Sequence, residues 1–355
     1  MDILQAIILG IVEGITEYLP ISSTGHLILA NSWMNIKGDA VDPYLIVIQG
    51  GAILAVLGLY RERVWTMLRG LAGKHASGLK LAMNLMIAFM PAAILGFLFH
   101  DMIVRLLFHP TPVVLALGVG GIVMLFAARW QRSAFQEGGD SRSFIDIGHL
   151  TWKQALVIGL LQCIAMWPGT SRSMMTIVGG MAVGLRPKHA AEFSFLLGLP
   201  TLGGATLYEI YKNSEAISTL DTGPIVVGII VAFITAAIAI KWLVAYLSKH
   251  GLAIFGWYRL AFATFIAIGL YCGYFSLEGN KAESTSAGGE AMFSTMLPVT
   301  FENDHCPEFP IAIQAVPSTI TGPTTDCQWP VLISSSSCTS AQRSPLILPP
   351  DETRQ

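Results

Sequence analysis

Residues 13–26 read EGITEYLPISSTGH, and this stretch decides how the chain folds. It places two carboxylates, three hydroxyl-bearing residues in a row and an imidazole between apolar runs on either side. Polar side chains that cannot be hydrated inside a membrane are costly and are usually functional. We therefore expect this stretch to line a site, with a helix broken at Leu19-Pro20.

The composition indicates a membrane protein. Of 355 residues, 53% are hydrophobic and only 12% are charged, whereas about a quarter of residues are charged in soluble proteins. The lipid bilayer is therefore an expected partner and nucleic acid is not. The net charge of −2 says nothing more about partners, because in membrane proteins the side on which Lys and Arg lie matters more than their sum.

Six apolar stretches have the length of about 17 to 25 residues that crosses a bilayer. They are Tyr44–Tyr60, Leu81–Phe99, Val113–Ala128, Ala191–Tyr211, Pro224–Leu247 and Leu252–Phe275. The connections Arg61–Lys80 and Arg129–Lys153 are rich in Lys and Arg. These two loops are predicted to be cytoplasmic, which places both chain ends outside.

Two further apolar stretches, Ile3–Leu19 and Gln154–Trp167, do not fit as spans. The second has about 14 residues, too few to cross a bilayer as a helix. Each is broken by a proline, Pro20 or Pro168. The alternation of the spans requires each to enter and leave on the same side, from opposite faces of the membrane. We expect two re-entrant hairpins that point toward each other.

The two hairpins are similar in sequence. Gln5–Glu13 aligns with Gln154–Gln162, and after one residue of slippage Leu19–Ser23 aligns with Trp167–Ser171. In inverted repeats, broken helices meet near the bilayer midplane and form a site there. The fold expected is an all-α polytopic membrane protein with about six spanning helices and two opposed re-entrant hairpins. A domain of residues 1–278 would have repeat halves of about 1–128 and 150–278.

The second hairpin carries the features of an anion site. After the break at Pro168, a new helix would present free backbone N–H groups and its positive dipole end. A guanidinium and hydroxyls beside those groups suit a phosphate. The expected phosphate-binding residues are Arg172, Thr170, Ser171, Ser173, Thr176, Ser22 and Thr24.

The first hairpin carries candidate catalytic groups. Glu13 and Glu17 are four residues apart and share a helix face. Beside a phosphate they need a hard cation such as Mg²⁺ or Ca²⁺ between them, or one of them protonated. Ser23 and His26 are three residues apart and would form a hydroxyl nucleophile with an imidazole base.

These motifs resemble those of the undecaprenyl-diphosphate phosphatase family of the bacitracin-resistance type. The resemblance rests on the acids Glu13 and Glu17, the segment Leu19–His26 and the segment Pro168–Thr176, and it covers Met1 to Phe275. It implies hydrolysis of a C55 isoprenoid diphosphate to the monophosphate, which recycles the lipid carrier of cell-wall synthesis. It also implies dependence on a divalent metal, and a bacterial plasma-membrane location with the active site open to the outer face.

By motif position, the resemblance implies a catalytic set of Glu13, Glu17, Ser23, His26 and Arg172. It leaves open whether Ser23, His26 or a metal-bound water attacks phosphorus. We expect Ser23 to attack, His26 to act as base and later as acid, and Arg172 to neutralise charge in the transition state. The two glutamates would hold the metal or orient His26.

Other interpretations remain. A transporter or flippase for an anionic polyprenyl lipid would show much the same broken helices and acids, but it does not need Ser23 beside His26. Ser22 and Thr24 would alternatively satisfy broken helix ends, and Gly10 with Gly14 is typical of close helix packing. A homodimer is left open as an assembly.

Residues 279–355 depart from the family. They are rich in Ser, Thr and Pro and contain no apolar run of span length. We expect a disordered or non-native extension without a function of its own.

Overall fold

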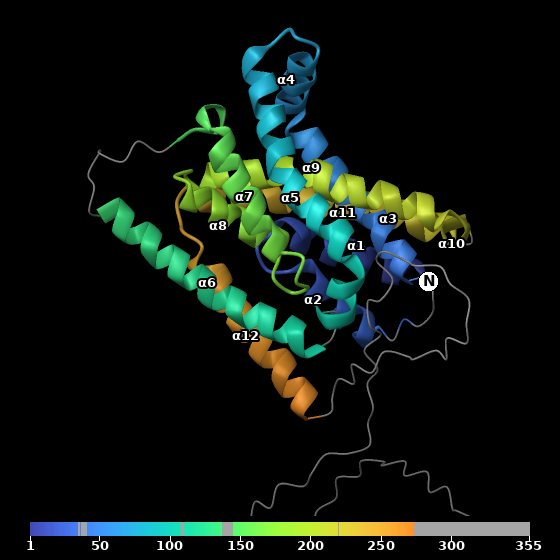
Figure 1. The fold of residues 1–355 in the computed structure, drawn as a ribbon. Helices are drawn as coiled ribbons and strands as arrows, with labels where there is room; N and C mark the ends of the chain where they lie inside the picture. Colours follow the sequence, from blue (N-terminus) through green and yellow to red (C-terminus); the bar gives the residue numbers. More distant parts are fainter. Residues whose placement is uncertain (35, 37–40, 108–109, 137–144, 219, 273–355) are drawn as a thin grey trace, which may run out of the picture. The chain divides into compact units, whose positions relative to one another are not determined.

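The computed structural model describes residues 1–34, 36, 41–107, 110–136, 145–218 and 220–272 (Figure 1). Within these ranges the chain is helical, and β pairing is limited to one isolated bridge between Ile145 and Leu185. Residues 279–355, expected to be disordered, lie outside the described residues.

The helices follow one another with short connections. The first half contains α1 Ile3–Tyr18, α2 Ser23–Trp33, α3 Val41–Leu59, α4 Arg61–Leu71, α5 Ala76–Leu107 and α6 Pro110–Gln136. The second half contains the 3₁₀ helix η1 Ile147–His149, then α7 Trp152–Ile164, α8 Arg172–Ala182, α9 Pro187–Lys212, α10 Ser214–Ser218, α11 Thr222–Leu247 and α12 Ala253–Tyr271.

Four of the described helices are long and apolar enough to cross a membrane. They comprise Ala76–Phe99, Thr111–Gln131, Thr222–Leu247 and Ala253–Tyr271. A fifth span results if Pro43–Leu59 and Arg61–Leu71, which are bent by 80° relative to each other, are counted together. The chain is therefore an all-helical, multi-pass membrane protein.

By length and apolar composition, the described residues contain four or five spans, fewer than the six predicted. The predicted stretch Tyr44–Tyr60 qualifies only as part of the bent pair, and Ala191–Tyr211 lies within α9, which is not among the candidates. Helix α9 is long, but Pro200 and several small or polar residues dilute its apolar character. Of the predicted stretch Leu252–Phe275, the last three residues lie outside the described ranges.

The segment Arg61–Lys80, which we expected to be a connecting loop, is largely helical. It forms α4 and the start of α5, and the two helices pack against each other at the top of Figure 1. Glycines permit this close approach: a Cβ atom on Gly70 would lie 2.5 Å from the carbonyl carbon of Gly78. The charged residues of this segment had suggested a loop. A hydropathy pattern does not show the glycine contacts that allow the two helices to pack closely.

Both predicted helix breaks are present, and both preceding helices begin alike. Helix α1 starts at a capping box formed by Asp2 and Gln5, and α7 starts at one formed by Thr151 and Gln154. In a capping box the two side chains satisfy free N–H groups reciprocally. Helix α1 ends before Leu19, whose backbone is extended.

The breaks also end alike. Ser22 (φ 76°, ψ 100°) precedes α2, and Ser171 (φ 74°, ψ 115°) precedes α8. Among the described residues, these are the two non-glycine residues with positive φ. Ser171 follows Ser22 by the same number of residues as Gln154 follows Gln5. The predicted alignment of the two hairpins, which shifted by one residue between these points, is therefore wrong. Backbone strain of this kind tends to occur at functional sites.

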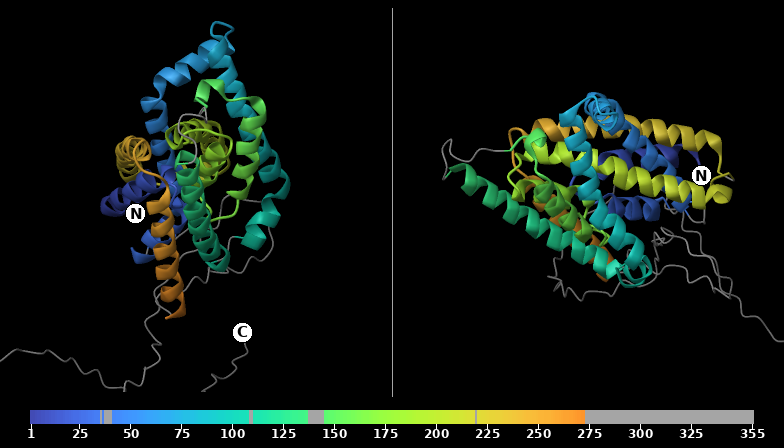
Figure 2. Two further views of the ribbon diagram at one scale, coloured as in Figure 1. Left: turned by 90° about the vertical axis from the view of Figure 1, so that its left-hand side faces the viewer. Right: turned by 45° about the horizontal axis from the view of Figure 1, so that its top comes forward.

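The broken helices are held by packing against long helices. Helix α1 packs against α11 and α3, α8 packs against α9, and α12 lies along α6 (Figures 1 and 2). Gly10 and Gly14 face α11, and a Cβ atom on Gly14 would lie 2.5 Å from the carbonyl oxygen of Ala232 and would also overlap Thr235. The interpretation of this glycine pair as a packing motif agrees with these contacts.

We predict that Gly14→Ala destabilises the protein. The added methyl would push α1 away from α11, and overpacking of this kind costs about 1–3 kcal/mol. The measurement is the thermal midpoint of the purified protein in detergent. Gly50→Ala in α3 is the matched control, because a Cβ atom there meets nothing within 4 Å. Equal midpoints for the two variants would contradict the close α1–α11 contact.

Candidate active site

A cavity of about 260 Å³ lies between the two helix breaks. Helices α1, α2, α3 and α9 and the segment from Ala165 to Arg172 form its walls. The polar residues that line it are Glu13, Glu17, Ser22, Ser23, Thr24, Gln49, Ser171 and Arg172. The structure therefore brings residues of both predicted hairpins to one place.

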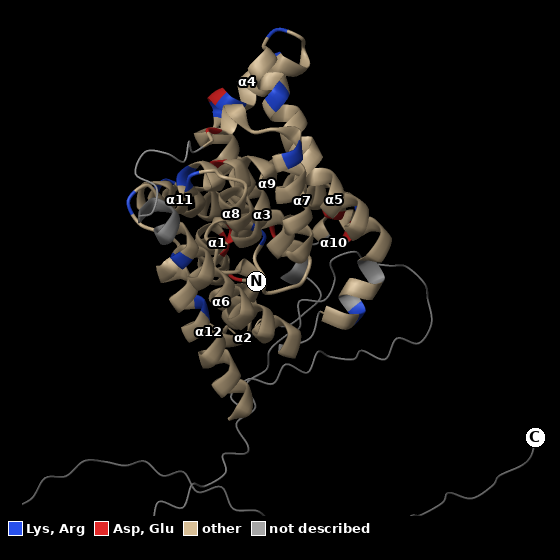
Figure 3. Cartoon of the chain, turned by 60° about the vertical axis from the view of Figure 1, so that its left-hand side comes forward, with Lys and Arg blue, Asp and Glu red and all other residues tan. Residues whose placement is uncertain are grey.

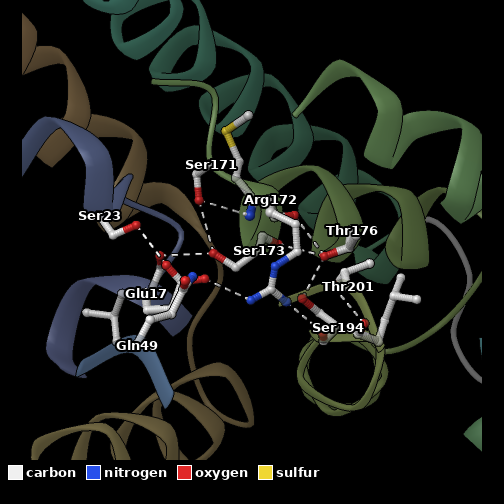
Figure 4. A network of polar contacts seen from close by, with 12 residues as sticks. Glu17, Ser23, Gln49, Ser171, Arg172, Ser173, Thr176, Ser194 and Thr201 are labelled. Carbon is white, nitrogen blue, oxygen red and sulfur yellow. Dashed lines mark hydrogen bonds and ion pairs between the residues drawn. The ribbon is translucent and has the colours of Figure 1, made fainter. Parts of the chain in front are cut away.

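Glu17 is the centre of the polar network in this cavity (Figure 4). Its Oε2 accepts a hydrogen bond from Ser23 Oγ at 2.8 Å, and its Oε1 pairs with Arg172 Nη2 at 3.0 Å. Arg172 Nη1 also donates to the backbone oxygen of Ser194 at 2.9 Å. The Arg172–Glu17 pair is nearly buried, with side chains 12% and 8% exposed. One ion pair thus joins the two breaks and fixes a serine hydroxyl beside them.

Glu13 lies one turn before Glu17 and lines the same cavity. It is 2% exposed. The two carboxylates therefore share a face of α1, as their spacing predicts. Among the described residues there is no group of three or more His, Cys, Asp or Glu side chains placed to hold a metal. The oxygen donors present fit Mg²⁺, which is usually held by one or two carboxylates together with waters and substrate phosphates.

His26 does not hydrogen-bond to Ser23, contrary to our expectation from their spacing. Its Nδ1 lies 2.7 Å from the backbone oxygen of Ser22, and its Nε2 lies 2.7 Å from the Tyr258 hydroxyl. Its ring stacks on Phe262 with 4.1 Å between centroids. Helix α12 therefore draws the imidazole away, while Ser23 turns to Glu17. An i, i+3 spacing permits a contact but does not require one.

The predicted phosphate-binding residues divide into two groups. Ser22, Thr24, Ser171 and Arg172 line the cavity, whereas Thr170, Ser173 and Thr176 do not.

The buried hydroxyls outside the cavity hold the helices together. Ser173 Oγ donates to the backbone oxygen of Leu19 at 3.0 Å and so joins the two breaks directly. Thr176 Oγ1 lies 2.6 Å from Ser194 Oγ and joins α8 to α9. These two side chains support the site rather than face it.

Sequence reasoning missed Gln49, which lies on α3 and lines the cavity. Its Oε1 accepts a hydrogen bond from Thr206 Oγ1 at 3.3 Å. The signal was available, because Gln49 is the one amide side chain in the apolar stretch Tyr44–Tyr60. A polar residue isolated in an apolar span indicates a functional site, as an intramembrane charge does.

Sequence reasoning also missed Arg259, which is fully buried on α12. Its guanidinium donates to four backbone oxygens: Gly169 at 2.7 Å, Ala116 at 3.1 Å, Leu117 at 3.3 Å and Pro20 at 3.5 Å. Two of these acceptors belong to the two breaks. Its signal was a lone arginine inside a predicted span.

The fold and the cavity together define a multi-pass α-helical membrane protein with an embedded, charged and hydroxyl-rich site. The family model described as Bacitracin resistance protein BacA matches residues 6–265. The chain belongs to this family. The matched range includes every residue that lines the cavity.

Curated relatives cover most of the chain. An undecaprenyl-diphosphatase of Nitrosomonas europaea is 46% identical over 271 residues, which are 76% of this chain and 96% of the relative. An undecaprenyl-diphosphatase of Sorangium cellulosum is 45% identical over 264 residues, 74% and 84% of the two chains. A protein of Rhodospirillum rubrum named undecaprenyl-diphosphatase 2 is 44% identical over 275 residues, 77% and 97%.

We predict that Gly120→Ala weakens the support given by Arg259. A Cβ atom on Gly120 would overlap the guanidinium and lie 2.8 Å from its Cζ. Displacement of Arg259 leaves buried carbonyls without donors, at a cost of about 1–3 kcal/mol. The thermal midpoint in detergent should fall by about 2–4 °C for each kcal/mol lost.

Gly118→Ala on the same helix is the control, because its added atom would meet only Ala263 Cβ at 4.0 Å. A midpoint for Gly120→Ala as high as that of Gly118→Ala would show that Arg259 is not constrained by α6.

Proposed function

We infer that this protein is an undecaprenyl-diphosphatase, an enzyme that hydrolyses undecaprenyl diphosphate to undecaprenyl phosphate and phosphate. Membership of the bacitracin-resistance family and the shared name of the relatives support this function. The activity recycles the lipid carrier for cell-wall synthesis and fits the resistance in the family name. The observation that carries the chemistry is the Ser23–Glu17–Arg172 network in one cavity.

We propose that Ser23 attacks the terminal phosphorus. Its hydroxyl already donates to Glu17 Oε2 at 2.8 Å, within the range from which a base takes a proton. As the new oxygen–phosphorus bond forms, the bond to the bridging oxygen breaks and the lipid monophosphate leaves. Water then hydrolyses the phosphoserine, releasing phosphate and restoring the Ser23 hydroxyl.

Arg172 is proposed to stabilise the charge that develops on the phosphoryl oxygens. Its guanidinium lies at the cavity wall at the start of α8. Donors fixed in advance at the place where charge develops are among the largest contributions to catalysis. Ser22, Thr24 and Ser171 line the same wall and are proposed to bind the phosphates.

The role proposed for His26 differs from our first expectation of a general base. Because both ring nitrogens are engaged by Ser22 and Tyr258, and Glu17 occupies the place beside Ser23, the geometry favours a positioning role. In that role His26 holds the strained backbone at Ser22 against α12. The alternative, that the ring turns to Ser23 when substrate binds, is decided by the variants below.

We propose that Glu13 and Glu17 hold a divalent cation, Mg²⁺ or Ca²⁺, when substrate binds and Arg172 turns from Glu17 Oε1 to the phosphate, while Glu17 Oε2 stays beside Ser23. Both are oxygen ligands on one wall of the cavity, and two carboxylates would otherwise repel a diphosphate. A cation there would screen this repulsion and draw charge from the phosphate oxygens.

We also propose the finer topology that the sequence predicts. The matching geometry of the two breaks supports an inverted repeat with opposed re-entrant hairpins. In this arrangement the protein spans a bacterial plasma membrane about six times, and the cavity opens to the outer face.

Phosphate release from undecaprenyl diphosphate by the purified protein in detergent tests the proposed function. We predict that Ser23→Ala and Arg172→Ala each lower kcat at least 100-fold, as loss of a nucleophile or an oxyanion donor does. EDTA should abolish release, and added Mg²⁺ or Ca²⁺ should restore it. Thr264→Ala is the control, because its hydroxyl donates to the backbone oxygen of Leu260 within α12, away from the cavity.

Absence of release by a folded wild type would instead favour a lipid carrier. Transport of the lipid between vesicle leaflets would then be the assay.

Substitution of His26 distinguishes its two roles. We predict that His26→Gln, which keeps a side-chain donor, retains much more activity than His26→Ala, and that Tyr258→Phe lowers kcat only a few-fold. Glu17→Gln should be as inactive as Ser23→Ala. If His26→Gln were as inactive as His26→Ala while Glu17→Gln kept activity, His26 would be the base.

A further inference from the structure

A second cavity, of about 690 Å³, lies away from the candidate active site. It is lined by Gln131 in the last part of α6, by the start of α9 at Pro187, and by the passage from α11 into α12 between Tyr246 and Ala253. None of its lining residues belongs to the charged cavity between the helix breaks. It is therefore a separate feature of the fold.

The lining of this cavity is strongly basic. It includes Arg186, Lys188, His189, Lys249 and His250, and none of its described residues is Asp or Glu. Figure 3 shows Lys and Arg beside the label of α11, apart from the second group around α4. Asp146 lies 3.6 Å from His189 Nδ1 and is about half exposed, and within the described ranges neither Lys188 nor Lys249 has a carboxylate at ion-pair distance. The charge of the two lysines is therefore available to an anion.

Two helices begin at this cavity without side-chain caps. Helix α9 follows Arg186 and α12 follows Leu252, and neither residue caps its helix with a side-chain hydrogen bond. The first N–H groups of a helix lack intrahelical partners and carry the positive end of the helix dipole. Together with the basic side chains, these groups suit a phosphate.

The remaining lining favours a lipid over a soluble anion. Pro187, Leu247, Ala253 and the ring of Tyr246, which stacks with His250 at 4.7 Å, provide apolar surface beside the cations. The cavity also lies at the ends of three apolar helices that are long enough to span a membrane. In a bilayer crossed by these helices, phospholipid headgroups would lie at this level, and basic pockets between spanning helices are suited to them.

We propose that this cavity binds the headgroup phosphate of an anionic phospholipid. The lysines Lys188 and Lys249 and the free helix ends would hold the phosphate, while the apolar residues would contact the glycerol and the start of the acyl chains. This goes beyond the general attraction of basic loops to an anionic leaflet, because it assigns one lipid to one cavity. It does not depend on the phosphatase activity.

Native mass spectrometry of the full-length protein, titrated with phosphatidylglycerol or phosphatidylcholine, tests the proposal. We expect one phosphatidylglycerol to be retained in preference to phosphatidylcholine. Lys188→Gln combined with Lys249→Gln should weaken this binding about 30-fold, from about 1 kcal/mol per basic residue near an anionic surface. Arg63→Gln combined with Lys153→Gln removes the same charge from exposed positions outside the cavity and should leave the affinity unchanged.

Two results would overturn the proposal. Equal loss of binding in the two double variants would mean that only the overall charge attracts the lipid. Displacement of phosphatidylglycerol by millimolar inorganic phosphate, with the wild type showing no preference between the two lipids, would assign the cavity to a soluble anion. Thermal midpoints of both variants, expected to match that of the wild type, show that each is folded.

Discussion

A buried guanidinium that donates to backbone oxygens holds the two helix breaks in place. A helix that stops inside an apolar protein leaves carbonyl groups that water cannot reach, and each must find a donor. Arg259 supplies donors to Pro20 in one break and Gly169 in the other. Because one rigid fork reaches both, the breaks cannot shift independently. The cavity of the candidate active site lies between the two breaks that this anchor joins.

The negative and the positive charge of the site come from different helix breaks and neutralise each other. Glu17 from α1 meets Arg172 from α8, and Ser173 of α8 donates to Leu19. A buried ion pair adds little net stability, but removal of one partner leaves an uncompensated charge. This is why substitutions at Arg172 or Glu17 need a folding control as well as an activity assay. Glu13, beside this pair, is the group that a bound cation would compensate most directly.

The sequence predicted the features that depend on local chemistry. Pro20 and Pro168 mark both breaks, Gly10 and Gly14 mark a close helix contact, and the spacing of Glu13 and Glu17 places them on one face. Contacts between segments that are distant in the sequence were harder to predict. Ser23 pairs with Glu17 rather than His26, because the choice depends on where α12 places Tyr258. The backbone acceptors of Arg259 and the folding back of α4 likewise depend on tertiary packing, which no local pattern contains.

The two broken helices share an N-terminal capping box and a following serine with positive φ, but they carry opposite charges. Ser23 at the start of α2 corresponds to Arg172 at the start of α8, and Glu13 corresponds to Gln162. Two copies of the first half would bring four carboxylates together, and two copies of the second would bring two guanidiniums together, each without a counter-charge. A chain of this kind therefore cannot be replaced by a symmetric pair of identical halves. The charge balance of the cavity therefore depends on the difference between the two broken segments, with carboxylates in one and a guanidinium in the other.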